Sequence, residues 1–261
     1  MSSVTPLDKP TNVVQLTVAS YNIHGCRGLD YRVDADRVVR VIRAFDTDIV
    51  ALQEVAVQRG KSDNLGQLNY IAKATGFEGL PGPALLHPNA PCGTALLTRH
   101  HRILAIRHLD LSVSRREPRG ALDVDLEVEG MVFRIISTHL GLRAWERREQ
   151  VARLLAALST TNGDLVMLTG DINEWFPLRQ TLHWLHTFFG KRYAPATFPS
   201  FFPILALDRL WVKKQPNVLK TAIKAYKTPL ALIASDHLPL LANITVDKGQ
   251  AETSLAKKTL R

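Results

Sequence analysis

The stretch "DLVMLTGDIN", residues 164–173, decides the fold. Its apolar centre predicts a buried strand, and the run stops where Asp171 and Asn173 follow. Loops held by a rigid sheet are where binding and catalytic groups tend to lie, so polar residues delivered by a buried strand indicate a functional edge. This one segment therefore predicts a sheet and the part of it where chemistry takes place.

The same transition from an apolar run to a polar residue recurs along the chain. If the strand ends converge on one edge of the fold, these polar residues come together in one site. The residues are Asn22, His24, Glu54, His139, Asp171, Asn173, Asp208, Asp236 and His237.

Predicted helices and strands alternate along the chain. Apolar residues at helical spacing predict helices over 34–45, 64–77, 145–158 and 177–189, the last with Pro177 at its start. Apolar runs and alternation predict strands over 15–23, 48–55, 93–99, 101–112, 121–130, 131–140, 164–173, 205–214 and 238–246. Residues 121–130 alternate apolar and acidic residues, which predicts a strand with one solvated face. Helices mixed with paired antiparallel strands favour a layered α/β sandwich.

Composition predicts one domain with an anionic partner. The chain has 261 residues, 46% of them hydrophobic, and we expect a single domain over 13–247 with flexible termini at 1–12 and 248–261. The formal charge of +9 suits nucleic acid, an acidic membrane surface or a phosphorylated small molecule.

Cysteine usage and the N-terminal sequence bear on the compartment. The chain has two cysteines, Cys26 and Cys92, which fits a reducing compartment better than a disulfide framework. Asp8 and Lys9 lie where a signal peptide needs its apolar stretch, and no uncharged apolar run reaches the roughly 18 residues of a membrane span. We therefore expect a cytoplasmic monomer without a transmembrane segment.

The residue types at the strand ends favour a hard cation. Carboxylates such as Glu54, Asp171 and Asp236, joined by amides, are ligands suited to Mg²⁺ or Mn²⁺. His139 and His237 are then free for proton transfer or for contact with developing negative charge. The chain lacks HExxH, CxxC, GxxxxGK[ST] and GxSxG, which disfavours zinc hydrolases, P-loop nucleotide triphosphatases and α/β-hydrolases.

At this point the motifs resemble a known family. "YNIHG", "LQEV", "GTALLTR", "STHLG", "GDIN", "LDRLWV" and "SDHLPL" occur in the order found in the endonuclease/exonuclease/phosphatase (DNase I-like) superfamily of metal-dependent phosphoesterases, from residue 18 to about 245. The resemblance implies a four-layer α/β sandwich, with two mainly antiparallel β-sheets packed face to face and helices outside. It also implies a site at one edge of the sheets and hydrolysis of a phosphate ester.

The resemblance also implies roles for single residues. Glu54 resembles the principal metal ligand, Asp236 a second metal carboxylate, and Asn22 the first-strand Asn near metal and phosphate. For catalysis, Asp171 resembles the residue that orients or deprotonates the attacking water.

Further roles concern the phosphate. Asn173 would hold a phosphoryl oxygen, and His237 would contact the scissile phosphate with Asp208 fixing its tautomer. His139 matches an additional His, a candidate general acid, and Arg119 lies where several branches place an Arg or Tyr against the phosphate.

One departure bears on the substrate. The abasic-endonuclease branch has an Asp two residues after the first Asn, whereas this chain has His24, which we assign to substrate contact. A phospholipid or inositol-phosphate head group fits this departure and the "STHLG" motif, whereas DNA or RNA fits the +9 charge. The loop 198–205, "FPSFFPIL", is a candidate lipid-touching or base-stacking lip. A catalytically inactive anion-binding protein is a third alternative, disfavoured by the intact polar set.

Overall fold

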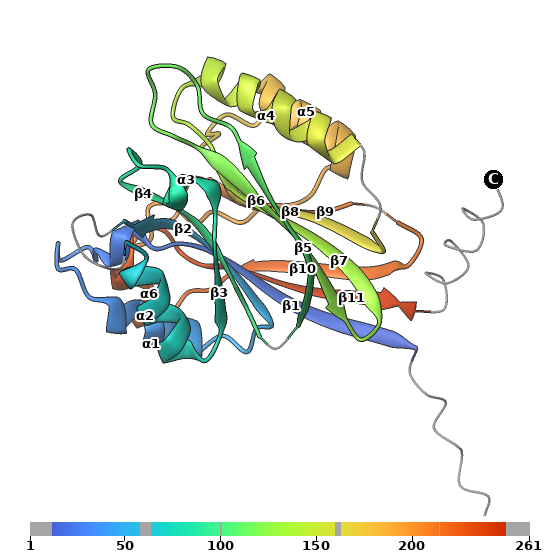
Figure 1. Ribbon diagram of the computed structural model, residues 1–261, viewed down its shortest axis with the longest axis horizontal. Coiled ribbons are helices and arrows are strands. Elements are labelled where there is room, and N and C mark those ends of the chain that lie inside the picture. The colour runs from blue at the N-terminus through green and yellow to red at the C-terminus, as the bar shows by residue number, and fades with distance from the viewer. Residues whose placement is uncertain (1–11, 58–63, 100, 160–162, 214, 249–261) are drawn as a thin grey trace, which may run out of the picture.

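The computed structural model describes residues 12–57, 64–99, 101–159, 163–213 and 215–248. Two β-sheets pack face to face and helices cover their outer faces (Figure 1). The expected flexible termini, 1–12 and 248–261, fall outside the described residues except for Asn12 and Lys248. Within the described ranges, no helix is long and apolar enough to cross a membrane.

The first sheet has six strands in the order β10-β11-β1-β2-β4-β3. β1 and β2 run parallel, and the other neighbours run antiparallel. The strands are β1 (Val13–Asn22), β2 (Ile49–Ala56), β3 (Glu78–Pro81), β4 (Cys92–Thr98), β10 (Val218–Ala225) and β11 (Leu240–Asp247).

The second sheet has five strands in the order β5-β6-β7-β8-β9, with β7 and β8 parallel and the rest antiparallel. The strands are β5 (Arg102–Asp110), β6 (Gly120–Val128), β7 (Met131–His139), β8 (Leu165–Asp171) and β9 (Asp208–Val212). Both sheets are therefore mainly antiparallel, as the resemblance implies.

Three apolar clusters define the four layers. One lies between the sheets and includes Leu16 of β1 and Phe133 of β7. A second packs the outer face of the first sheet against helices, and a third packs Trp211 of β9 against helices on the outer face of the second sheet. The helices are α1 (Ala35–Arg43), α2 (Gly66–Thr75), α3 (Pro83–Leu86), α4 (Ala144–Ser159), α5 (Gln180–Phe189) and α6 (Pro229–Ala234), with a 3-10 turn, η1, at His24–Cys26. The predicted four-layer sandwich is confirmed.

The structure differs from the sequence prediction at the start of helix α5 and in the solvent exposure of strand β6. Helix α5 begins at Gln180 rather than at Pro177, because residues 176–179 form a turn in which Arg179 N–H donates to Phe176 O (3.1 Å). β6 is not solvated on one face throughout, since Asp123 is buried between two arginines, Arg107 and Arg134. The prediction also missed β3, β10, α3 and α6.

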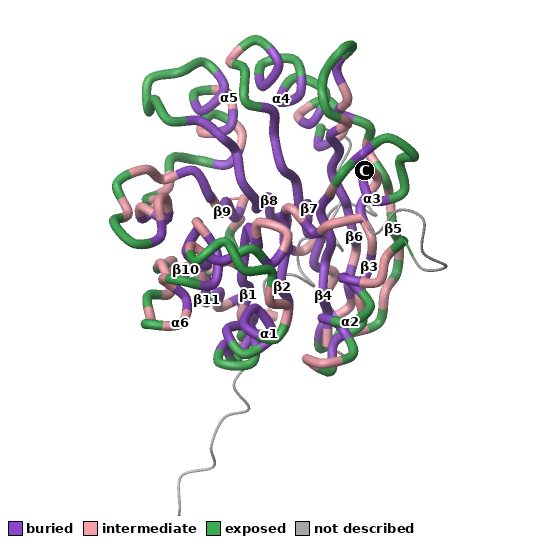
Figure 2. The backbone as a smooth tube through the Cα atoms, turned by 90° about the vertical axis from the view of Figure 1, so that its left-hand side faces the viewer, coloured by how far each residue is buried: buried purple, intermediate pink, exposed green. Residues whose placement is uncertain are grey.

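The strand register brings the polar strand ends together. In the second sheet, His139 pairs with Asp171 and Asp171 pairs with Asp208, so three neighbouring strands present them in one row. In the first sheet, Asn22 pairs with Gln53, the residue before Glu54. The chain leaves β1 at the left of Figure 1, and Figure 2 shows that side with exposed connections around buried strands.

Candidate active site

The carboxylate of Asp171 is the centre of the site. Its Oδ2 accepts from Asn22 Nδ2 at 3.1 Å and lies 3.5 Å from His139 Nε2 and 3.7 Å from His237 Nε2. Its Oδ1 accepts from Asn173 N–H at 2.9 Å. Burial raises the pKa of Asp171 and Asp208 adds to the rise, while His237 and the hydrogen bonds oppose it. A desolvated carboxylate with a raised pKa is a stronger proton acceptor than one in water.

Gly170 allows β8 to approach β7 at this point. Its φ is +140°, and a Cβ atom there would lie 1.9 Å from Thr138 O. No other residue type fits such a close backbone approach. The glycine in "GDIN" therefore places Asp171 directly beside His139.

His237 is held as a cation by carboxylates. Its Nδ1 lies 2.8 Å from Asp208 Oδ2, which also accepts from Thr197 Oγ1 at 2.6 Å. Burial lowers the pKa of His237, but Asp208, Asp171 and Asp236 outweigh it and raise the value to about 10. The ring packs against Phe198 with centroids 4.8 Å apart. At neutral pH the site therefore contains an imidazolium directed at Asp171.

His139 is held neutral by its surroundings. Burial, Arg119 and His237 lower its pKa well below the usual value. Its Nδ1 lies 2.8 Å from Arg119 Nη1, and because a guanidinium only donates, Nδ1 must accept. The proton then lies on Nε2, 3.5 Å from Asp171 Oδ2. Asn173 Nδ2 lies 3.0 Å from the same nitrogen, but it is itself a donor and its hydrogen bond goes to Leu140 O (2.9 Å). A neutral imidazole donates a hydrogen bond well but is a weak acid, so this geometry favours charge stabilisation over the predicted general acid.

Arg119 lies behind His139 rather than in an open position. Its side chain is buried, and Nη2 donates to Glu117 Oε2 at 3.0 Å. The structure thus places Arg119 in contact with a site residue, where it fixes the tautomer of His139.

A β-bulge positions Glu54. The register between β2 and β4 shifts between Leu52 and Val55, and Glu54 adopts a φ of +54°. Bulges often re-aim a side chain beside an active site, and a left-handed non-glycine residue costs roughly 1–2 kcal/mol. The carboxylate of Glu54 accepts from Asn22 Nδ2 at 3.0 Å, and the described residues provide it with no further hydrogen bond.

Asn22 bridges the two sheets. Its Nδ2 donates both to Glu54 and to Asp171, and its Oδ1 accepts from His24 N–H at 3.0 Å. The amide oxygen expected to face a metal is thus engaged by the backbone. In this geometry Asn22 positions two carboxylates, and because its amide oxygen has a second lone pair, the expected metal contact of Asn22 stays a prediction.

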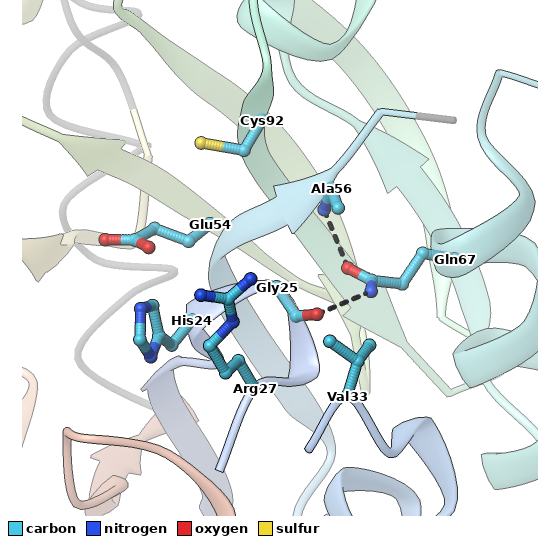
Figure 3. A pocket seen from close by; sticks show the side chains of 8 residues that line it. All are labelled: His24, Gly25, Arg27, Val33, Glu54, Ala56, Gln67 and Cys92. Carbon is cyan, nitrogen blue, oxygen red and sulfur yellow. Dashed lines mark hydrogen bonds between the residues drawn. The ribbon is translucent and has the colours of Figure 1, made fainter. Parts of the chain in front are cut away.

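A cavity of about 430 Å³ opens beside Glu54 (Figure 3). Its floor is braced by Gln67 of α2, which donates to Gly25 O (3.0 Å) and accepts from Ala56 N–H (2.7 Å). The lining residues are His24, Gly25, Arg27, Val33, Glu54, Ala56, Gln67 and Cys92.

Asp236 approaches this cavity from the segment before β11. Its Oδ1 lies 3.6 Å from Nδ1 of His24. Ser235 is buried and donates to Asn22 O at 2.7 Å, which holds the segment against the end of β1. His24 and Asp236 thus lie together, as the sequence predicts for site residues.

A group able to hold a metal ion occurs among the described residues at Asp171, Asp208 and His237. Within it, His237 Nδ1 and Asp208 Oδ2 are hydrogen-bonded to each other at 2.8 Å. We therefore interpret this group as a hydrogen-bonded Asp208–His237 pair beside the carboxylate of Asp171. Glu54, which lines the cavity, and Asp236, which lies beside His24 of the cavity wall, supply further hard oxygen donors of the kind that Mg²⁺ or Mn²⁺ prefers.

Sequence reasoning missed a buried ion pair that supports the site. Arg147 of α4 donates from Nη2 to Glu174 Oε2 at 3.1 Å and from Nη1 to Leu142 O at 2.7 Å. Thr181 Oγ1 also donates to Glu174 Oε2, at 2.7 Å. The pair joins the connection that follows His139 to the residue that follows "GDIN". The position of Glu174 directly after "GDIN" is a signal in the sequence that could have identified it, whereas nothing in the sequence distinguishes Arg147 from the other arginines of its helix.

Comparisons with known proteins identify the family. The model of the Endonuclease/Exonuclease/phosphatase family matches residues 19–237. The uncharacterized protein YbhP of Escherichia coli (strain K12) is 29% identical over 251 residues, which cover 90% of this chain and 98% of that protein. At the level of the fold, the chain resembles D. rerio TDP2 in complex with a single-strand DNA product, with a TM-score of 0.66, 17% identity, and coverage of 88% of this chain and 98% of that one. It also resembles the mannosyl-6-phosphatase Bt3783 of Bacteroides thetaiotaomicron VPI-5482, with a TM-score of 0.64, 19% identity, and coverage of 88% and 99%. The family match, the four-layer sandwich and the row of polar strand ends agree, and the chain belongs to the endonuclease/exonuclease/phosphatase family.

Proposed function

We propose that this protein is a divalent-metal-dependent phosphoesterase in which water attacks phosphorus in line. The observation that carries the proposal is the convergence of His139, His237 and Asn22 on one carboxylate oxygen of Asp171. A buried acceptor flanked by fixed donors suits a reaction that removes a proton from water while negative charge grows on a phosphoryl group.

Each residue of the cluster has a distinct role in the proposed reaction. Asp171 accepts the proton of the attacking water through Oδ2. His237, held charged by Asp208, stabilises the negative charge of the transition state. Neutral His139 donates from Nε2, and Asn173 holds a phosphoryl oxygen. Arg119 keeps His139 in that tautomer.

Glu54 and Asp236 would hold Mg²⁺ or Mn²⁺ at the cavity side of this cluster. Polarisation of a phosphoryl oxygen and stabilisation of the leaving oxygen are the chemistry that such a cation supplies. Asn22 would keep the Glu54 carboxylate in place. His24, on the cavity wall, would contact the part of the substrate that is not cleaved.

Two substrate classes are consistent with this site. We favour the phosphodiester or phosphomonoester of a phospholipid or inositol-phosphate head group, because the departure at His24 separates the chain from the abasic-endonuclease pattern. The alternative is DNA or RNA, which the +9 charge favours. TDP2, a protein of the same fold, is known in complex with a single-strand DNA product.

Hydrolysis of bis-p-nitrophenyl phosphate tests the reaction class. We expect release that requires Mg²⁺ or Mn²⁺, stops with EDTA, and falls about 100-fold to 1,000-fold in His237→Ala, since that is the usual effect of losing one transition-state donor. His183→Ala, which changes an exposed histidine of α5, is the matched control and should retain activity. Equal release by wild type and His237→Ala would refute the assignment. Supercoiled plasmid, sphingomyelin, phosphatidylglycerol and inositol phosphates then separate the substrate classes.

A further inference from the structure

Two connections at the site edge carry exposed apolar side chains. One connection leaves β8 after Asp171, and the other leads into β9 at Asp208. Asp171 and Asp208 pair directly, so the strand ends of the two connections lie side by side. Each of the six residues below is between 55% and 97% exposed. We call this set the apolar rim: Trp175, Phe176, Leu178, Phe201, Phe202 and Ile204.

The connection that enters β9 is anchored at its base and exposed at its tip. Phe198 packs on His237, and Ser200 N–H donates to Asp236 O at 2.7 Å. Ser200 Oγ lies within hydrogen-bonding distance of Ser235 O (2.7 Å). The turn is closed by Phe202 N–H donating to Pro199 O (3.1 Å). Phe201 and Phe202 are thus held outward on a turn that contacts the site itself.

The connection that leaves β8 has the same construction. Buried Glu174 fixes its base, and Phe176 N–H lies 3.4 Å from Glu174 Oε1. Trp175 and Leu178 on this connection are 55% and 97% exposed. Several exposed apolar side chains gathered on an anchored turn are a feature that marks interaction sites.

The charge of this region is complementary to an anionic surface. Between Asp171 and Asp208 the sequence has a single acidic residue, Glu174, which is buried in its pair with Arg147. The basic residues of the same segment are Arg179, Lys191 and Arg192, and the Arg179 guanidinium lies 5.1 Å from the centre of the Phe176 ring. Aromatic and aliphatic side chains among basic ones are the composition that binds the interface of an anionic bilayer.

We propose that the apolar rim docks the protein on an anionic lipid surface, with the active site facing the bilayer. Leu178 and Ile204 favour this occupant over single-stranded nucleic acid, because aliphatic side chains gain by entering the acyl region but offer bases no aromatic face for stacking. Docking brings the site to its surface because Phe198 and Ser200 connect the rim to His237 and Asp236. This surface goes beyond the proposed hydrolysis and does not depend on it.

Sedimentation with vesicles tests the docking surface. We expect wild type, in EDTA so that no turnover occurs, to bind vesicles that contain phosphatidylglycerol, and to bind vesicles of phosphatidylcholine alone much more weakly. Phe201→Ala/Phe202→Ala and Trp175→Ala/Leu178→Ala should each weaken binding at least about tenfold, because each double substitution removes most of two apolar side chains that the bilayer would bury. Leu219→Ala is the matched control, since Leu219 is also exposed but follows Val218, which pairs with Val246 at the opposite end of β11.

The outcomes separate the partners. The midpoint temperature of thermal unfolding is measured for each variant. A midpoint equal to that of the wild type shows that weaker vesicle binding does not result from unfolding of the variant. Failure of wild type to bind anionic vesicles, or equal binding by the rim variants, would overturn the proposal. Binding to oligothymidylate that both rim pairs weaken, without vesicle binding, would overturn it in favour of single-stranded nucleic acid.

Discussion

The buried pair between Arg147 and Glu174 provides the sharpest test of how the site is supported. Glu174 Oε2 accepts from Nε (3.2 Å) and Nη2 (3.1 Å) of Arg147, and both side chains are nearly inaccessible to water. Arg147 Nη1 also donates to Gly141 O at 3.2 Å and to Leu142 O at 2.7 Å. The substitutions Arg147→Met and Glu174→Gln, alone and together, remove one or both charges of this pair.

Removal of one partner leaves the other charge desolvated. Such a change costs about 3–5 kcal/mol of unfolding free energy. We expect the loss of unfolding free energy in Arg147→Met to lie within this range, because Glu174 then keeps only Thr181 as a side-chain donor among the described residues. The double variant buries no charge, so its cost should fall short of the sum of the single variants by about 1–3 kcal/mol.

Urea unfolding followed by circular dichroism measures these values. Arg153→Met is the matched control, because Arg153 pairs with Glu149 on the same helix, α4, but both side chains are more than a third exposed. Exposed pairs contribute about 0–1 kcal/mol, so this variant should unfold near the wild-type midpoint. If Arg147→Met unfolds no more easily than Arg153→Met, the pair does not act as a desolvated link between the two site connections.

Two further predictions concern the strand contact and His139. Gly170→Ala should lose about 2–4 kcal/mol of unfolding free energy and most activity, because its Cβ atom would meet Thr138 O. The control Gly130→Ala has a φ of +82° but open space around it, so it should lose only about 1–2 kcal/mol. Equal melting temperatures of the two variants would contradict this prediction. His139→Gln tests whether the pKa of His139 is lowered in the folded protein. Below pH 6.5 the unfolded wild type binds a proton at His139 that the folded protein does not bind. The unfolding free energy of the wild type should therefore fall, relative to that of the variant, by up to about 1.4 kcal/mol per pH unit as the pH is lowered. Urea midpoints of both proteins at neutral and mildly acidic pH measure the difference, and parallel curves would argue against a neutral buried His139.

Much of the fold follows from local sequence patterns. The segment 164–173 is readable because a buried strand flanked by a helix on its outer face is apolar at almost every position. β10 has no such signal, since it is an edge strand with Lys220 and Lys224, and each of its positions is either exposed or only partly buried. α6 has six residues, too few for helical periodicity to separate it from an apolar strand.

Burial of charge is the feature that local patterns cannot reveal. Alternation in residues 121–130 correctly predicts a strand, but water does not cover the outward Asp123. Arg107 from β5 and Arg134 from β7 flank it, 16 residues before and 11 residues after it in the chain. The partners arrive through strand pairing, which depends on the register of the whole sheet.

The two site histidines show the same limit with a functional consequence. His139 and His237 are both buried beside Asp171, yet the pKa of one is lowered and that of the other is raised. The difference comes from the residue at Nδ1, which is the guanidinium of Arg119 in one case and the carboxylate of Asp208 in the other. β6 and β7 bring Arg119 to His139, and β9 brings Asp208 to the segment before β11. Residue type therefore predicts two histidines at the phosphate, whereas the strand order decides that one is a neutral donor and the other a cation.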